Sequence, residues 1–227
     1  MTRANAQNSW QALQRFLLLV VLCGCSLSQA GSYDDFFRAI KQDNAEVVST
    51  LLNRGFDPDT LNPKGEHGLV LAVREPSLKV IAVLLAWPKI NVEVRTPQDE
   101  SALMLAALQG STELCEQLIA KGADVNKPGW TPLHYAATHG HLAVMTLLLD
   151  QDAYIDAESP NSTTPLMMAA QYGTAAAVKL LLEAGADPLL KNKQGLTALN
   201  FAQRGSRPDA IELIASFIRK IQPKEAW

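Results

Sequence analysis

Small and apolar residues recur along the chain with a period close to 33 positions, and this recurrence predicts how the chain is built. Each copy begins with an apolar anchor, and the anchors are Phe36, Leu69, Leu103, Leu133, Leu166 and Leu199. Successive anchors lie 33, 34, 30, 33 and 33 residues apart. Three positions after each anchor stands an alanine, at Ala39, Ala72, Ala106, Ala136, Ala169 and Ala202. A column that every copy shares indicates an internal repeat.

Two further apolar columns predict a second helix in every copy. Twelve positions after the anchors stand Val48, Ile81, Cys115, Met145, Val178 and Ile211. Fifteen positions after the anchors stand Leu51, Leu84, Leu118, Leu148, Leu181 and Ile214. Because residues three positions apart share one face of a helix, the anchor and its alanine predict a first helix, and the later columns predict a second. Helices this short are marginal alone, so each pair should fold only against its neighbours.

Glycines and a threonine mark the predicted helix ends. Gly110, Gly140 and Gly173 stand seven positions after their anchors, where a left-handed residue is expected to close the first helix. The glycines expected to close the second helix stand nineteen positions after the anchors, at Gly55, Gly122 and Gly185. Thr131 and Pro132 suit the N-cap and the first position of a helix.

The stretch TPLHYAATHGHLAVMTLLL, from Thr131 to Leu149, resembles an ankyrin repeat, whose T-P-L-H-x-A signature recurs about every 33 residues. Residues 101–126 and 164–188 follow the pattern closely. The resemblance implies an all-α fold, an ankyrin repeat solenoid of about six stacked helix-turn-helix repeats with capping end repeats. The domain is expected at 31–221, followed by a C-terminal tail at 222–227. The expected repeats are 32–64, 65–98, 99–128, 129–161, 162–194 and 195–220.

One connection between repeats is shorter than the others. Three residues are missing between Asn126 and Gly129, which accounts for the spacing of 30. In ankyrin repeats the loop between successive repeats is called a finger, so the resemblance implies a shortened finger with Trp130 on what remains. Ser159→Ala, on the following finger, is expected to be close to neutral for stability.

The first thirty residues are predicted to be a signal peptide. They contain an apolar run from Phe16 to Cys23, which is too short to span a bilayer, and their only charges are two arginines. The small residues of Ser28-Gln29-Ala30 suit a cleavage that releases a chain beginning at Gly31.

A second processing site competes with this one. Leu22-Cys23-Gly24-Cys25 resembles a bacterial lipobox, which would make Cys25 a lipid anchor. We favour release, because the first helix is expected to begin near Tyr33 and a lipidated Cys25 would leave only a short tether, at ~3.5 Å per residue. The expected location is therefore periplasmic or secreted. The alternative is a lipoprotein at the membrane surface.

Composition and charge narrow the range of partners. Of 227 residues, 48% are hydrophobic and 19% are charged, as in globular proteins. Without residues 1–30 the chain has 18 basic and 23 acidic residues, a formal charge of −5, and no basic block. No nucleic-acid partner is expected, and a membrane is expected only if Cys25 is lipidated. Cys115 is the one cysteine after residue 30 and is expected in the core.

The resemblance implies that a protein partner lies against a concave face, made by the finger tips and the carboxyl ends of the first helices. The candidate binding residues on helices are Arg74, Leu108, Thr138, His139, Gln171 and Tyr172, and those on fingers are Trp130, Lys193 and Gln194. Trp130, His139, Tyr172 and Leu108 are the expected contact centre, since aromatic anchors are enriched at interfaces. The alternative is structural: Trp130 covers the shortened finger and Tyr172 packs on it.

Catalysis, metals and cofactors are not expected. The sequence has no Gly-x-Ser-x-Gly, phosphate-loop, Cys-x-x-Cys or His-Glu-x-x-His motif. His134 and His139 are five positions apart, about 140° around a helix, and do not converge on a metal. We expect an exported, monomeric, non-catalytic module that presents a rigid concave surface, as an accessory or inhibitor of an exported enzyme. The alternatives are a lipid-anchored structural protein attached through Cys25 and, less favoured, an enzyme.

Overall fold

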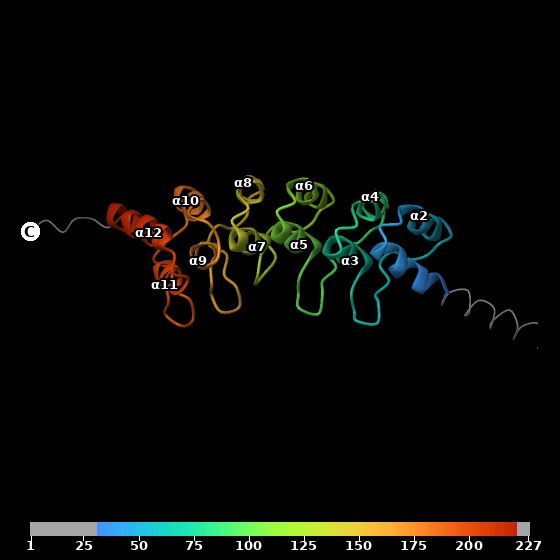
Figure 1. The fold of residues 1–227 in the computed structure, drawn as a ribbon, viewed down its shortest axis with the longest axis horizontal. Helices are drawn as coiled ribbons and strands as arrows, with labels where there is room; N and C mark the ends of the chain where they lie inside the picture. Colours follow the sequence, from blue (N-terminus) through green and yellow to red (C-terminus); the bar gives the residue numbers. More distant parts are fainter. Residues whose placement is uncertain (1–30, 222–227) are drawn as a thin grey trace, which may run out of the picture.

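The computed structural model describes residues 31–221, which form a row of helix pairs joined by loops (Figure 1). The first helices of the pairs lie in one layer, the second helices lie in another, and long loops project beyond the first layer (Figure 1). The first layer contains residues 31–41, α3 (Gly68–Arg74), α5 (Ala102–Gln109), α7 (Pro132–His139), α9 (Pro165–Gln171) and α11 (Ala198–Arg204). The second layer contains α2 (Ala45–Asn53), α4 (Leu78–Ala86), α6 (Thr112–Ala120), α8 (Leu142–Asp150), α10 (Ala175–Glu183) and α12 (Pro208–Ile221). The predicted all-α repeat fold is confirmed.

The core follows the predicted columns along the whole row. All six recurrent alanines are at most 3% exposed. Ala136 lies in α7, which packs against α5 on one side and α9 on the other. The anchors are fully buried up to Leu166, whereas Leu199 and Ile211 in the last pair are half-buried. Within the described residues no further helix pair follows to cover them, which is the physical condition of a cap.

Each central first-layer helix begins with a reciprocal cap. The hydroxyl of Thr131 accepts a hydrogen bond from the backbone N–H of His134, and Nδ1 of His134 accepts one from the N–H of Thr131 at 3.1 Å. In α5 and α9 a methionine takes the place of the histidine, and its sulfur accepts the N–H of the capping residue at 3.4 Å and 3.5 Å. Caps of this kind satisfy N–H groups that a helix start leaves free. The predicted cap at Thr131 is confirmed.

The glycines that end the first helices do so for two reasons. Gly110 and Gly140 have φ of 73° and 69°, which confirms the predicted left-handed closure. The prediction is wrong for Gly173, which does not have a positive φ. A Cβ at Gly173 would lie 2.4 Å from the carbonyl oxygen of Ala137, so glycine is needed there because α7 approaches closely. At the ends of second helices Gly55, Gly122 and Gly185 have φ of 92°, 93° and 105°, as predicted.

The shortened finger is braced by a buried lysine. The ammonium group of Lys127, in a residue only 2% exposed, contacts the carboxylate of Asp99 on the preceding finger and donates to the carbonyl of Pro128 at 3.0 Å. On the next finger Ser159 is 4% exposed, and its hydroxyl accepts the N–H of Thr163 at 2.9 Å. Ser159→Ala would remove this hydrogen bond and leave the buried N–H of Thr163 without it. The expectation that this substitution is close to neutral for stability is therefore not supported.

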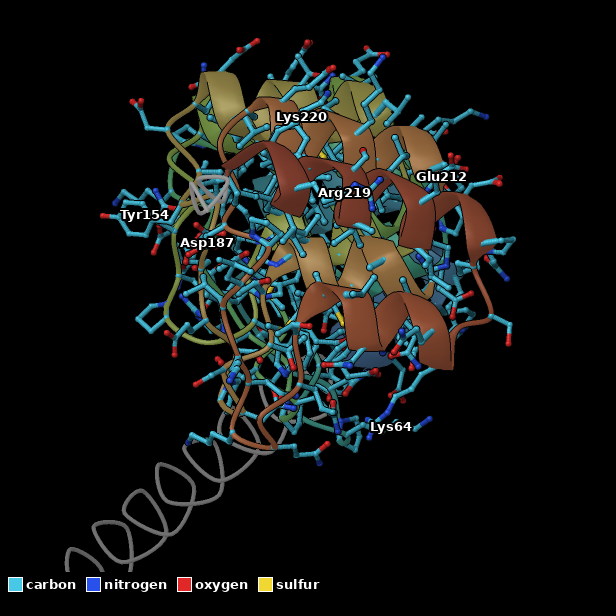
Figure 2. The ribbon with its side chains drawn as sticks, turned by 90° about the vertical axis from the view of Figure 1, so that its left-hand side faces the viewer. Lys64, Tyr154, Asp187, Glu212, Arg219 and Lys220 are labelled. Atoms are coloured by element: carbon cyan, nitrogen blue, oxygen red, sulfur yellow. The ribbon has the colours of Figure 1, made fainter. Side chains whose placement is uncertain are left out.

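Viewed along the row, the molecule has two different flanks. Lys64 extends beside the loops below the first-layer helices, whereas Tyr154 and Asp187 lie on the opposite flank (Figure 2). Among the described helices, none combines the length and the apolar character needed to cross a bilayer. The predicted signal peptide at 1–30, the candidate anchor Cys25 and the predicted tail at 222–227 lie outside the described residues.

Candidate protein-binding face

A small apolar cavity lies near the middle of the face between the first-layer helices and the loops, and we name it the central hollow. It measures about 240 Å³ and is lined by Leu108, Trp130, His134, Tyr135, Thr138 and Met168. Its walls come from α5, α7 and α9, together with the residue just before α7. Two of the four residues of the predicted contact centre, Trp130 and Leu108, therefore meet in one place.

Trp130 lines this hollow from the position just before Thr131, the N-cap of α7. The ring of Trp130 is half-buried and meets the ring of His134 edge-on, with centroids 5.2 Å apart and planes at 75°. Tyr172 is 55% exposed. The structure thus packs one edge of Trp130 against His134 of α7 and leaves part of its ring exposed, and no ring contact between Trp130 and Tyr172 is found among the described residues.

The polar groups around the hollow are directed into the protein. Nε2 of the fully buried His134 donates to the carbonyl of Thr163 at 2.8 Å, and Nδ1 accepts from Thr131. Burial lowers the pKa of His134 to about 4, so the ring is neutral at pH 7. The hydroxyl of Thr138 donates to the carbonyl of His134 at 2.8 Å. A ligand in the hollow therefore meets mainly carbon atoms.

The hydroxyl of Tyr135 is also hydrogen-bonded within the protein. Its hydroxyl donates to Oε1 of Glu100 at 3.2 Å. Burial, helped by the nearby Glu100 carboxylate, raises the pKa of Tyr135 to about 12, so the phenol keeps its proton. An apolar side chain can enter such a site without leaving a polar group of the protein unpaired. A charged side chain cannot enter it without losing its hydration.

The remaining predicted residues lie outside the hollow, apart from Thr138. His139 and Tyr172 stand at the carboxyl ends of the neighbouring helices α7 and α9, and both are exposed. The ring of His139 stacks on that of His141 with centroids 5.7 Å apart. Gln171 is half-buried beside Tyr172 in the chain. These residues extend the face beyond the hollow along the helix ends.

The predicted residues near the two ends of the row are also exposed. Arg74 pairs with Glu66 and lies 3.7 Å from a carboxylate oxygen of Glu100. Lys193 and Gln194 lie on the last finger, where the backbone N–H of Lys193 donates to the carbonyl of Asn161 at 3.0 Å. The nine predicted residues are therefore spread along the row, and they are not gathered in one cluster.

Sequence reasoning missed Tyr135 and Met168, which complete the hollow. Both stand two positions after their anchors, and in three other repeats this position holds Leu71, Leu105 and Phe201. It lies three positions before the candidates Leu108 and Thr138, so it belongs to the same helix face. The missing signal was this additional apolar column.

The described residues contain no arrangement typical of a metal centre or a reactive thiol. In residues 31–221 no group of three His, Cys, Asp or Glu side chains is placed to hold a metal ion. Cys115 is fully buried, as its apolar column predicts, and burial raises the pKa of its thiol to about 12. The thiol is protonated at neutral pH and shielded from reagents.

Comparison with protein families accounts for most of the described chain. A family model described as ankyrin repeats in three copies matches residues 36–127 and 69–159, and one described as ankyrin repeats in many copies matches 154–202. The nuclear factor NF-kappa-B p105 subunit of Gallus gallus is 33% identical over 165 residues, or 70% of this chain and 17% of that protein. An ankyrin repeat-containing protein of Treponema pallidum is 27% identical over 198 residues, or 83% of this chain and 64% of that protein. The chain thus spans less than two thirds of the length of these relatives.

A solved structure is similar over nearly its whole length. It is a chain in the complex of Bd0816, a predatory endopeptidase from Bdellovibrio bacteriovorus, with the immunity protein Bd3460. The TM-score is 0.70 and the sequence identity is 28%, and the match covers 80% of this chain and 97% of that chain.

Proposed function

Because the chain belongs to the ankyrin repeat family, whose repeats build protein-protein interaction modules, we propose that it is a non-catalytic inhibitor that binds an exported endopeptidase. The observation that carries this proposal is the likeness to a chain from an endopeptidase–immunity protein complex, at a TM-score of 0.70. The likeness extends over 97% of that chain. An immunity-type role needs no catalytic groups of its own, only a surface that holds the enzyme.

The central hollow supplies a binding site for one side chain of such a partner. Its polar groups are bonded within the protein, and its lining is mostly apolar, so it suits one apolar side chain of the enzyme. Interfaces of this kind depend on a few buried aromatic contacts, and the hollow offers the half-buried rings of Trp130 and Tyr135. The row of packed helices holds this surface in one shape before binding, so little conformational entropy is lost when a folded partner docks.

The proposed location follows from the apolar run in residues 1–30 and from the kind of partner. A leader of that composition directs export, and an inhibitor must share a compartment with its enzyme. We therefore place the binding event in the periplasm or outside the cell, and take the chain to act as a monomer.

The test combines capture of the native partner with an activity measurement. The full-length chain is crosslinked in its native host, the captured partner is purified, and its peptidase activity is measured with and without added chain. We expect stoichiometric inhibition. A partner with no peptidase activity, or an active peptidase that the chain leaves uninhibited, would contradict the proposed function.

Two aromatic variants locate the interface. Trp130→Ala should raise the concentration needed for half-maximal inhibition by about thirtyfold, the effect of losing an interface anchor worth ~2 kcal/mol. Tyr154→Ala is the matched control, since Tyr154 is 67% exposed and lies on the opposite flank (Figure 2). Equal effects of the two variants would remove the hollow from the interface.

A further inference from the structure

We propose that the same face binds an acidic, extended segment of the partner, with a carboxylate held between Lys41 and Lys64 and an apolar side chain in the central hollow. This inference rests on the proposed protein-binding function and specifies the chemistry of the partner. It starts from a second and larger cavity, of about 590 Å³, at the amino-terminal end of the row, which we name the N-terminal pocket. Its lining comes from the helix at 31–41, the loop at 62–66 and α3.

The floor of the N-terminal pocket is apolar and fixed in place. Phe37 is 8% exposed and Leu71 is 4% exposed, and both belong to the core cluster. Tyr33 ties the first helix to the loop, because its hydroxyl donates to the carbonyl of Leu61 at 2.9 Å. The pocket is therefore a preformed feature of the first two repeats.

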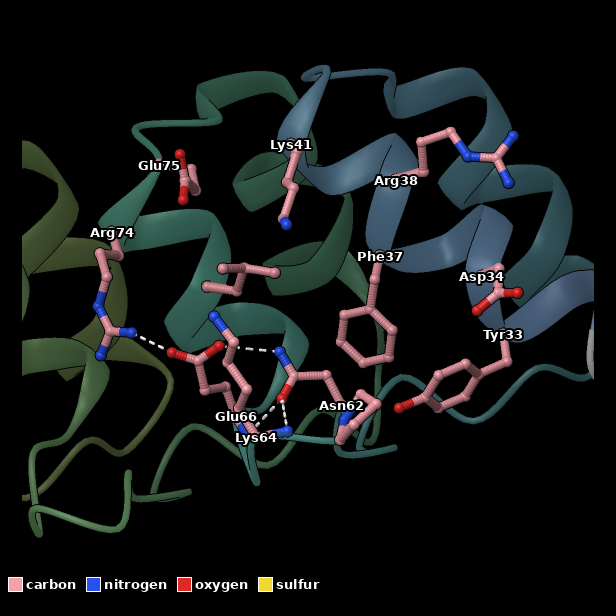
Figure 3. A pocket seen from close by; sticks show the side chains of 12 residues that line it. Tyr33, Asp34, Phe37, Arg38, Lys41, Asn62, Lys64, Glu66, Arg74 and Glu75 are labelled. Carbon is pink, nitrogen blue, oxygen red and sulfur yellow. Dashed lines mark hydrogen bonds and ion pairs between the residues drawn. The ribbon is translucent and has the colours of Figure 1, made fainter.

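The carboxylate inside the pocket is already neutralised by the protein. Oε2 of Glu66 accepts a hydrogen bond from the side-chain amide of Asn62 at 2.8 Å, and Oε1 pairs with Arg74 (Figure 3). The side chain of Asn62 also accepts the backbone N–H groups of Lys64 and Glu66, both at 2.9 Å. This network lowers the pKa of Glu66, chiefly through the Asn62 hydrogen bond, and keeps Glu66 and Arg74 occupied with each other.

Two lysines of the pocket form no salt bridge with another described residue. In residues 31–221 neither Lys41 nor Lys64 forms one, whereas Arg38 pairs with Asp35 at 3.1 Å. The charge of Lys64 also contributes, less than Asn62 and Arg74, to the lowered pKa of Glu66, whose carboxylate is already paired with Arg74. Figure 3 shows the ammonium groups of Lys41 and Lys64 reaching toward the middle of the pocket, one from the first helix and one from the loop. The pocket's other two acidic residues, Asp34 and Glu75, lie toward its edges and not between these ammonium groups (Figure 3).

Two converging ammonium groups above an apolar floor fit a carboxylate carried by a chain with apolar neighbours. Each ammonium group can donate to a carboxylate oxygen in a charge-assisted hydrogen bond. The rest of the segment can then cover Phe37 and Leu71. The chain without residues 1–30 carries a formal net charge of −5, so the rest of its surface repels such a segment. The lysine pair therefore attracts an acidic segment to this pocket, whereas the net negative charge of the chain repels such a segment elsewhere.

The two sites also fix a spacing in the partner. The N-terminal pocket lies between the first two helices of the first layer, and the central hollow is centred on α7, the fourth. With neighbouring helices ~8–10 Å apart, the sites are separated by roughly 20–25 Å. An extended chain covers ~3.3–3.6 Å per residue, so the carboxylate and the apolar anchor should stand about six or seven residues apart.

Selection of peptides on the full-length chain tests this directly. A phage-displayed library of random linear peptides of about twelve residues, long enough to reach both sites, is enriched on the immobilised protein. We expect the enriched peptides to combine an acidic and an apolar residue about six or seven positions apart. Enrichment without an acidic residue, or without this spacing, or no enrichment at all, would overturn the inference. None of these results depends on an endopeptidase. The proposed function is tested by the inhibition measurement, so the two can fail independently.

Charge reversal identifies the lysines. An enriched peptide with both ends blocked should bind the Lys41→Glu/Lys64→Glu variant about tenfold more weakly or worse, as measured by fluorescence anisotropy, and a Lys-for-Glu version of the peptide should recover binding. The control is Lys121→Glu/Lys220→Glu, which makes the same charge change at exposed positions away from the pocket. Equal losses in the two variants would contradict the proposed site. Loss of binding when the carboxyl terminus of the peptide is blocked would contradict the proposed internal acidic segment.

Discussion

His134 illustrates how one side chain serves the fold and the site together. It closes the cap of α7 through Thr131, reaches the next finger through the carbonyl of Thr163, and supports the ring of Trp130. The first contact needs a neutral ring, because Nδ1 must accept a hydrogen bond there, and burial also favours the neutral form. Its burial therefore couples stability to pH. Because the pKa falls from 6.5 in the unfolded chain to about 4 in the folded one, the stabilisation is complete above pH 6.5 and is lost as the pH falls toward 4.

Replacing His134 with methionine should weaken this pH dependence. Methionine already occupies the equivalent cap position at Met104 and Met167, so the cap itself can survive. Between pH ~7.5 and pH ~5 the wild type should lose about 2 kcal/mol through His134, at ~1.4 kcal/mol per pH unit, and His134→Met should lose less.

The measurement is urea unfolding of both proteins at the two pH values. The variant is expected to be less stable at the higher pH, because the carbonyl of Thr163 loses its donor. His67 provides a common background, since burial also lowers its pKa while Asp59 opposes the shift, and it is unchanged in the variant. Identical losses on acidification would show that His134 is not the titrating group.

At the scale of the helices, close approach governs which residues are allowed. Neighbouring first-layer helices meet through the alanine column, and Gly173 lets the carboxyl end of α7 come within contact of α9. Both features keep the helices near each other, and a small change in spacing would be repeated along the row. The alanines therefore set the pitch of the stack as much as they fill its core.

Enlarging one alanine should strain this stack. Ala136→Leu places a large side chain between α5 and α9 and should lower the free energy of unfolding by ~1–3 kcal/mol. Glu158→Ala, at an exposed position on a finger, should change it by less than ~0.5 kcal/mol. Equal denaturation midpoints for the two variants would contradict the close packing of the alanine column.

Two glycines can be compared to separate close approach from backbone strain. Gly173→Ala forces a methyl group against the carbonyl of Ala137 and should cost about 2–3 kcal/mol. Gly122→Ala has open space around its Cβ but a φ of 93°, and should cost only about 1 kcal/mol of left-handed strain. Thermal unfolding followed by circular dichroism compares them. A smaller effect at Gly173 would mean that α7 and α9 can move apart easily.

At the scale of the whole molecule, the stacked repeats fix the distance between the two pockets. The central hollow and the N-terminal pocket belong to different repeats, and the packed helices between them hold their separation constant. A partner that matches both sites gains from each without ordering the protein first. A repeat protein can thus select a partner by the spacing of two features as well as by their chemistry.

Export makes a prediction about the amino terminus of the whole protein. If residues 1–30 are removed as proposed, mass spectrometry of protein purified from its native host should find a chain that begins at Gly31. The expected cause is cleavage after the small residues of Ser28-Gln29-Ala30. A lipidated Cys25 at the terminus would instead favour the membrane-surface alternative, and an intact Met1 would contradict export through this leader.

The sequence by itself determined the helix pairs, their order and the faces that they bury. The alanine column and the two later apolar columns depend only on helix periodicity, which is a local property, and the structure places them as that periodicity requires. The cap at Thr131 could be predicted because capping also depends only on residues nearby in the chain. The burial of Cys115 follows from its column alone.

Only the tertiary structure decided which surface residues come together. Trp130 and Leu108 share a hollow with Met168 because α5, α7 and α9 stack side by side. Lys41 and Lys64 converge although they belong to different elements. Periodicity tells which face a side chain occupies, but the distance between side chains on different repeats depends on how closely the repeats pack. For that reason the helix face on which these residues lie was predictable from the sequence, and the two pockets were not.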